Sequence, residues 1–144
     1  MSIKDINVAL YDSLVDELVG LFEQRGFTIE GARLEPKYRP PDPIRNGRFG
    51  DQEDRVPDVL AFDYDGRRGI IGMVCLSDDD ITSDETLTKF NVFLNLPVPQ
   101  KEKPGLLFVI VPSSKIVHIT DFITHSLHPE YWEAIQIVAS QKIQ

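Results

Sequence analysis

Two apolar runs, residues 56–64 and 68–76, are separated by a short polar segment with an Asp-Gly dipeptide at positions 65 and 66. This dipeptide accepts the positive backbone angles of a tight turn between antiparallel strands, so the two runs predict a β-hairpin. The second run is apolar or glycine at every position from 70 to 76. Such a strand is covered on both faces, as the central strands of α/β sheets are, and it therefore constrains the fold more than any other feature of the chain.

Helices and strands are predicted on both sides of the hairpin. Before it, residues 5–24 carry an apolar residue at every fourth position, the stripe of an amphipathic helix, and residues 27–34 follow as a strand. After it, a helix is expected from the capping residue Ser83 to residue 94, and then a buried strand over residues 106–111. These elements favour the α/β class.

The last part of the chain is less regular in its pattern. A short strand is expected over residues 115–119 and a short helix from Thr120. Residues 129–140 predict a terminal helix, because Pro129 suits a first helical position. A strand over residues 134–139 is the alternative, and the sequence does not separate the two.

Size and composition indicate one domain over residues 1–144, since single domains usually contain about 100 to 150 residues. No apolar run approaches the roughly 20 residues that span a bilayer, so no membrane segment is expected. The first residues do not have the basic and apolar regions of a secretory signal. The single cysteine, Cys75, fits a reducing compartment, and we expect a cytoplasmic protein.

The hairpin resembles the core of one nuclease family. Pro57-Asp58 begins the first run, and the dipeptide turn and the apolar second strand follow it. In this arrangement the chain is similar to the PD-(D/E)xK, or restriction-endonuclease-like, superfamily, whose first strand supplies an aspartate and whose second strand ends in an acid, any residue and a lysine. The resemblance covers residues 6–111 and implies an αβββαβ core, in which a mixed central sheet is flanked by helices, with an extra C-terminal helix or strand.

The second strand departs from the superfamily at both functional positions. Asp58 matches the first acid, but Met73 and Cys75 stand where the second acid and the lysine are expected. A thioether is a poor ligand for Mg²⁺, and a cysteine in an apolar strand stays a neutral thiol. The resemblance therefore implies a degenerate, non-catalytic protein without a cofactor that acts as an interaction or regulatory module. Asp58 would then be a structural residue, satisfied by backbone donors near the hairpin.

One alternative is an unrelated soluble α/β domain, in which the likeness to the nucleases is accidental. The other alternative is a nuclease dependent on Mg²⁺ or Mn²⁺, because some members of the superfamily carry the missing groups on neighbouring elements. In that case Asp58, Glu85 and Lys89 are the catalytic candidates, and Asp58 and Asp78 are the metal ligands. The helical spacing of Glu85 and Lys89 equally fits an exposed ion pair.

Further acids are candidates for the same rescue. Asp78, Asp79 and Asp80 form a dense group that also fits a hydrated turn before a helix. Glu17 and Glu23 on the first helix could add a carboxylate, although both fit its solvated face.

Charge points to one candidate contact surface. The net charge of −8 opposes binding to phosphate backbones, which depends on Lys and Arg. Between residues 33 and 55, however, six basic residues stand against five acidic ones, a net charge of +1 that leaves −9 for the rest of the chain. The proline- and glycine-rich loop over residues 37–55, with Arg39, Arg45 and Arg48, is the candidate surface for a nucleic acid or a protein partner. Self-association and a merely solvated loop are the other readings.

The remaining reactive and aromatic residues suggest no further site. The histidines at positions 118, 125 and 128 have no cysteine or acid at the spacing of a zinc site. Cys75 is expected to be a small core residue, because its neighbours are apolar. Tyr131 and Trp132 are expected to pack in the core, with a partner-binding patch as the alternative.

Overall fold

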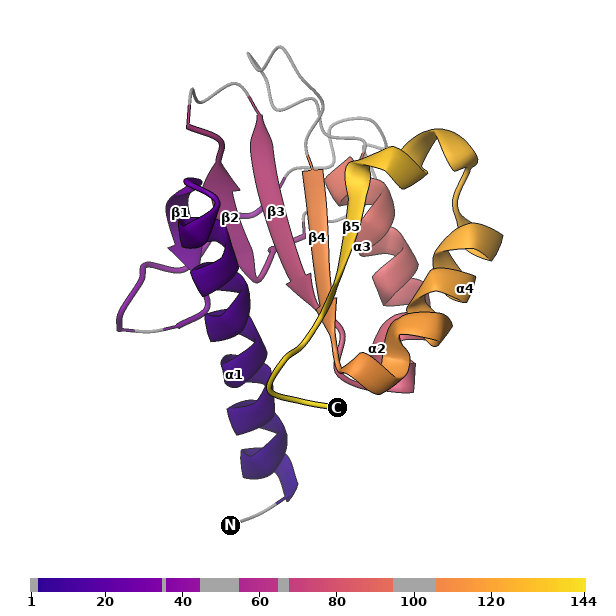
Figure 1. Cartoon of the computed structure of the whole chain (residues 1–144), viewed down its shortest axis with the longest axis horizontal. Coiled ribbons are helices and arrows are strands. Elements are labelled where there is room, and N and C mark those ends of the chain that lie inside the picture. The colour runs from indigo at the N-terminus through magenta and orange to yellow at the C-terminus, as the bar shows by residue number, and fades with distance from the viewer. Residues whose placement is uncertain (1–2, 35, 45–54, 65–67, 95–105) are drawn as a thin grey trace.

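A mixed five-stranded sheet forms the centre of the computed structural model (Figure 1), which describes residues 3–34, 36–44, 55–64, 68–94 and 106–144. The strands lie in sequence order: β1 (Thr28–Ala32), β2 (Val59–Phe62), β3 (Gly69–Val74), β4 (Leu106–Val111) and β5 (Ile135–Ala139). The pairs β1/β2 and β2/β3 are antiparallel, whereas β3/β4 and β4/β5 are parallel. The α/β fold with a mixed sheet and flanking helices is confirmed.

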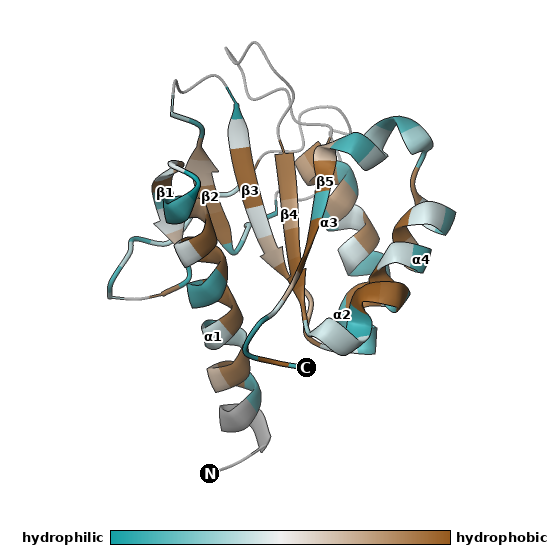
Figure 2. Ribbon diagram, viewed as in Figure 1, coloured by the Kyte–Doolittle hydropathy of each residue, from teal (hydrophilic) through white to brown (hydrophobic). Residues whose placement is uncertain are grey.

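Helices cover both faces of the sheet. The long helix α1 (Ile3–Gln24) packs on one face, and α3 (Asp84–Leu94) and α4 (Ile116–Ser126) pack on the other, next to the short α2 (Asp78–Thr82). The apolar residues of β3 and β4 lie between these layers, and Figure 2 shows both strands as largely hydrophobic. None of the helices in the described part of the chain combines the length and the apolar character needed to cross a membrane.

The predicted stripe of α1 is the side that packs on the sheet. Leu14, Leu18 and Phe22 are fully buried at helical spacing. The helix lies close to β3 because Gly72 has no side chain: a Cβ atom there would be 2.6 Å from Cδ2 of Leu18. After the helix, Gly26 adopts a positive φ of 81°, which turns the chain toward β1.

The predicted hairpin is confirmed in its pairing and corrected in its length. Strands β2 and β3 pair antiparallel, with Val59 opposite Gly72, but they are shorter than the apolar runs that predict them. Strand β1 is also shorter than the predicted run of 27–34. The turn at positions 65 and 66 lies outside the described residues.

The structure overturns two predictions in the last part of the chain. Residues 115–119 do not form a strand: a 3₁₀ turn, η1 (Ser113–Lys115), leads directly into α4, which therefore begins before Thr120. The buried positions Ile119 and Ile123 have helical spacing, which the short apolar run alone did not reveal. Residues 129–140 do not form a terminal helix either. They form a 3₁₀ turn, η2 (Pro129–Ala134), and then β5, so the strand alternative is correct.

Capping residues explain the two helices after β3. Ser77 and Asp80 form a capping box, so the three adjacent aspartates lie in α2 rather than in a hydrated turn. The prediction that Ser83 caps the next helix is confirmed, because its Oγ accepts a hydrogen bond from the Thr86 N–H at 3.1 Å.

Candidate functional site

Asp58 lies directly before β2 and is buried, with 4% of its surface exposed. Its backbone N–H donates to the Gly72 carbonyl at 2.9 Å, and its carbonyl accepts from the Arg33 N–H at 3.0 Å. The residue is therefore fixed between β3 on one side and the end of β1 on the other. A buried carboxylate in this position must find donors within the protein.

Both carboxylate oxygens of Asp58 have such donors. Oδ2 accepts from the Val74 N–H at 2.8 Å, and Oδ1 accepts from the Tyr11 hydroxyl. The partly exposed Arg33 adds a charge, with its Nε 3.6 Å from Oδ1. One carboxylate thus connects α1, β1 and β3, which is the structural role that the sequence suggested, with a side-chain donor in addition to the backbone one.

Burial determines the electrostatics of this group. Burial raises the pKa of Asp58 above its ordinary value, against the opposing effects of the hydrogen bonds from Tyr11 and Val74 and the charges of Arg33 and Lys89. Burial and the neighbouring Asp58 charge also raise the pKa of Tyr11 well above its usual range. The Tyr11 hydroxyl therefore keeps its proton and remains a donor to Asp58.

Met73 and Cys75 are core residues, with 3% and 1% of their surfaces exposed. Both belong to the apolar cluster that contains Phe90 of α3. Burial, followed by the charge of Asp80, raises the pKa of the Cys75 thiol to about 12. The prediction that Cys75 is a core residue is confirmed, and its sulfur is a neutral thiol at physiological pH.

This environment makes Cys75 unreactive in the native protein. A shift of the thiol pKa from 9.0 to about 12 lowers the thiolate fraction by about 1,000-fold, so a disulfide reagent should label the thiol only after unfolding. The absorbance released by such a reagent in buffer and in guanidinium measures the difference. A Cys75→Ala, Ser113→Cys variant, with its thiol at an exposed position, is the control that reacts at once. Rapid labelling of the native wild type would contradict this description of Cys75.

The two catalytic candidates on α3, Glu85 and Lys89, have different partners. Glu85 pairs with Arg55, with 2.8 Å between Oε1 and Nε, rather than with Lys89 as the helical spacing suggests. Lys89 is partly buried, and its charge acts on both Asp58 and Cys75, opposing the effect of burial on their pKa values. Of the two residues, Lys89 is therefore the one whose charge reaches the Asp58 region.

The acids after β3 have separate roles. Asp78 accepts hydrogen bonds from Lys115 Nζ at 2.7 Å and His118 Nδ1 at 3.0 Å, and these contacts, led by the Lys115 hydrogen bond, lower its pKa. The carboxylate of Asp80 instead accepts from the N–H groups of Leu76 and Ser77, at 2.9 and 3.1 Å. The charge of Asp80 also acts on Tyr11 and Cys75. Sequence reasoning did not single out Asp80 from its neighbours, although the Ser-x-x-Asp spacing of a capping box was available.

The acids of α1 serve the framework. Glu17 is partly buried and accepts from the Ser140 hydroxyl at 2.7 Å and from the Gln141 N–H at 2.8 Å, so its assignment to the solvated face is wrong. Glu23 is exposed, as expected, and accepts from the Tyr38 hydroxyl. Both carboxylates thus bond to other segments than the one that holds Asp58.

Of the basic loop, only part can be described. Arg39 Nη2 contacts Glu30 Oε1 at 2.9 Å and Asp42 Oδ2 at 3.3 Å, so local acids balance its charge. Arg45 and Arg48 lie outside the described residues.

The histidines and aromatic residues near the end of the chain have local roles. His125 Nδ1 contacts the Asp121 carbonyl at 2.7 Å, and the side chain of His128 caps η2. Within the described ranges, no three His, Cys, Asp or Glu side chains gather as a metal site requires. Trp132 is 39% exposed and donates to the Leu127 carbonyl at 3.2 Å, so its prediction as a core residue is wrong. Tyr131 is partly buried.

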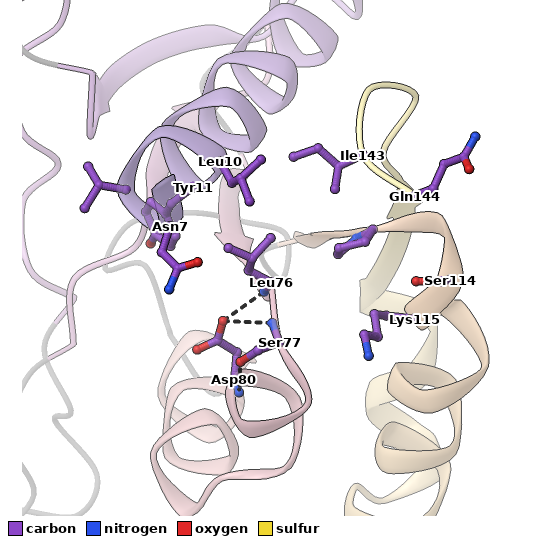
Figure 3. A pocket seen from close by; sticks show the side chains of 12 residues that line it. Asn7, Leu10, Tyr11, Leu76, Ser77, Asp80, Ser114, Lys115, Ile143 and Gln144 are labelled. Atoms are coloured by element: carbon purple, nitrogen blue, oxygen red, sulfur yellow. Dashed lines mark hydrogen bonds between the residues drawn. The ribbon is translucent and has the colours of Figure 1, made fainter. Parts of the chain in front are cut away.

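A cleft of about 830 Å³ opens at the carboxyl ends of β3 and β4, next to Tyr11 (Figure 3). Asn7 and Tyr11 of α1, Leu76 and Asp80 after β3, Lys115 after β4, and Gln144 line it. Tyr11 therefore borders the cleft and also donates to Asp58. No local sequence pattern predicts the cleft, because its walls come from segments far apart in the chain.

Three comparisons with known proteins gave no relative from which a role could be transferred. The function of the site is therefore inferred from its own residues and their geometry. The chain matches no model of a protein family, no curated protein and no solved structure.

Proposed function

We propose that the chain is a nuclease-fold protein that has lost catalysis and acts as an interaction or regulatory module. The observation that carries the proposal is the use of the Asp58 carboxylate inside the protein, where the Val74 N–H and the Tyr11 hydroxyl bond its two oxygens. The residues that stand at the positions of the second acid and the lysine, Met73 and Cys75, are packed in the core.

The order of the elements supports the nuclease-like framework. A helix, three antiparallel strands, helices and a strand parallel to the third follow one another from α1 to β4. This order fits the proposed αβββαβ core, and β5 extends the sheet beyond β4.

The chemistry of the site supports the loss of catalysis. Mg²⁺ prefers near-octahedral coordination by oxygen atoms at about 2.0–2.1 Å, and nucleases use it to activate water and to stabilise developing charge. The oxygens of Asp58 point to internal donors, the Met73 thioether is a soft group, and the Cys75 thiol is neutral. The residues present thus fit a structural carboxylate better than a metal ligand.

The cleft provides a surface for the proposed binding role. Ligands of α/β sheets commonly bind outside the carboxyl ends of the strands, which is where this cleft lies. We favour a protein partner over a nucleic acid, because a net charge of −8 repels phosphate backbones. The loop over residues 37–55, with Arg45 and Arg48, remains the proposed contact for an anionic partner, whereas Glu30 and Asp42 balance the charge of Arg39. The buried, reduced Cys75 fits the cytoplasm as the compartment of this role.

Titration of Mn²⁺ by calorimetry tests the loss of the metal site. Wild type, Asp58→Asn and Asp63→Asn are compared, since Asp63 is a partly buried acid that accepts from the Arg68 N–H at 3.1 Å, away from the Asp58 carboxylate. We expect the three titrations to coincide. A heat of Mn²⁺ binding that the wild type and Asp63→Asn show and Asp58→Asn lacks would contradict the proposal.

The second candidate function, a metal-dependent nuclease with migrated groups, is favoured by the charges around Asp58. Lys89 and Asp80 both act on Cys75, and Lys89 also acts on Asp58. A migrated active site would then use Lys89 with Asp58, and Asp80, which lines the cleft together with Tyr11, would replace Asp78 and Glu85.

DNA cleavage in Mn²⁺ distinguishes this candidate from the first. The wild type, Lys89→Ala and the control Lys142→Ala, which alters an exposed lysine 3.8 Å from Asp16, are incubated with plasmid DNA. The non-catalytic proposal expects no cleavage by any of them. Cleavage by the wild type and Lys142→Ala, but not by Lys89→Ala, would establish the nuclease.

A further inference from the structure

The two edge strands of the sheet, β1 and β5, differ in how far other segments cover them. At the β1 edge, the Ala32 N–H donates to the Arg39 carbonyl at 3.0 Å, and Arg39 Nε donates to the Glu30 carbonyl at 2.9 Å. A register shift interrupts β1 between Ile29 and Gly31. Pro41 packs so closely over Gly31 that a Cβ atom there would be 2.8 Å from its Cα. The segment that follows β1 thus closes this edge against pairing with another strand.

In the described part of the chain, the β5 edge is more regular and less covered than the β1 edge. Its sequence, Ile-Gln-Ile-Val-Ala over Ile135–Ala139, contains no charged residue, proline or glycine. Its pairing with β4 runs without a register shift over the whole strand. Natural edge strands commonly carry charges, prolines or bulges because a regular, uncharged edge pairs with other strands. An edge of this composition is expected to be covered in the working protein.

The backbone of β5 shows which groups are free for pairing. The Ser140 N–H donates to the Val111 carbonyl at 2.8 Å, so residues of the same parity turn toward β4, and Ile135, Ile137 and Ala139 turn outward. The Ile135 N–H already donates to the Trp132 carbonyl. The N–H groups of Ile137 and Ala139 point away from β4 in this register, and in the described part of the chain neither donates to another backbone segment.

We propose that β5 pairs antiparallel with β5 of a second copy of this chain, about a two-fold axis at Ile137. In this register Ile137 faces Ile137 of the other copy, and the two exchange both N–H···O bonds. Each Ala139 N–H then meets the Ile135 carbonyl of the other copy. The pairing uses both of the N–H groups that point away from β4 and leaves the Ile135 N–H bonded to Trp132, and it joins the two sheets into one.

Charge favours a second copy in this orientation. Glu130 and Glu133 precede β5, and Lys142 follows it. Antiparallel pairing places the acidic end of one strand beside the basic end of the other, whereas parallel pairing would place like charges together. A two-fold interface also closes on itself, so the open edge gives a dimer rather than a fibre. The exposed Trp132 lies at the start of the strand, as aromatic residues of protein interfaces commonly do.

The mass in solution of the full chain and of an Ala139→Pro variant tests the proposal. Ala139 is exposed and its N–H faces outward, so proline removes a donor to the second copy without removing a bond to β4. The wild type is expected at twice the chain mass of 16.3 kDa by sedimentation velocity. Two bonds are lost from the dimer in the variant, which should weaken dimerisation by about 30-fold or more and give a monomer.

Two further variants keep the result unambiguous. Thr28→Lys adds a charge to the exposed start of β1, at the protected edge, and should remain a dimer. Gln136→Lys adds a charge to the exposed face of β5 while keeping every backbone donor, and it should weaken dimerisation. This variant replaces Ala139→Pro as the test if circular dichroism shows that Ala139→Pro does not fold. A wild type that stays monomeric at its highest soluble concentration would overturn the proposal, and so would a folded β5 variant that dimerises as the wild type does. These outcomes do not depend on whether the Asp58 site binds metal.

Discussion

The Asp58→Ala variant is expected to lose about 2–3 kcal/mol of the free energy of unfolding, measured by urea denaturation. The substitution leaves the Val74 N–H without the acceptor that now lies 2.8 Å away, and a buried donor without a partner costs about 1–3 kcal/mol. It also removes the acceptor of the partly buried Tyr11 hydroxyl and leaves a small cavity. The contribution of Arg33 is small, because nearly half of its side chain is exposed.

The matched control is Asp58→Asn, which keeps an oxygen that can accept from the Val74 N–H and should therefore lose much less stability.

Comparison of the wild type with Asp58→Asn also isolates a pH dependence. Burial raises the folded-state pKa of Asp58 above its ordinary value of 3.8, so the folded protein binds this proton more tightly than the unfolded chain does. The stability of the wild type relative to Asp58→Asn should thus fall as the pH rises from about 4 through the folded-state pKa. Equal losses for Ala and Asn would contradict the role assigned to the Val74 hydrogen bond.

The Phe108→Ala variant is expected to lose about 3–5 kcal/mol, the largest effect of any single change considered. Phe108 is 1% exposed in the middle of β4, and its ring contacts Phe22 edge to face, with the ring centroids 5.1 Å apart. Phe27 contributes a second edge contact at 6.1 Å, and the Arg25 guanidinium lies 5.3 Å from the ring centroid. Truncation removes all these contacts at once and leaves a cavity between α1 and the sheet.

Urea denaturation of Phe108→Ala is compared with that of Tyr64→Ala, which deletes an aromatic side chain that is 89% exposed. The control should stay within about 0.5 kcal/mol of the wild type. Similar losses for the two variants would show that the aromatic cluster under α1 does not hold the helix on the sheet.

The fold followed from the sequence where one period was clear. The every-fourth-residue stripe of α1 and the long apolar run of β4 were unambiguous, and both elements are present. Around Ile116–Ile119 the pattern failed, because four residues with three apolar positions fit a helix and a strand equally. The prediction of a helix over residues 129–140 was wrong for another reason: this short segment contains both the turn that begins at Pro129 and the strand β5.

The contacts of the candidate site were harder to predict from the sequence than the fold. A backbone donor for Asp58 was expected from the hairpin, whose partner strand is near in sequence. Tyr11, in contrast, is 47 residues away from Asp58, and only packing of α1 on the sheet brings the two together. Glu85 illustrates the same limit: it has Lys89 at helical spacing, but it pairs with Arg55, 30 residues earlier. Such partners depend on the three-dimensional arrangement of elements, which local patterns do not contain.

The bond between Glu17 and Ser140 spans 123 residues, and it has a kinetic consequence. Contacts of such large sequence separation form late in folding, because the loop between them must be closed before the contact contributes. An interaction absent from the transition state changes the rate of unfolding more than the rate of folding. We therefore expect the polar contact between α1 and the segment after β5 to slow unfolding more than it changes the rate of folding.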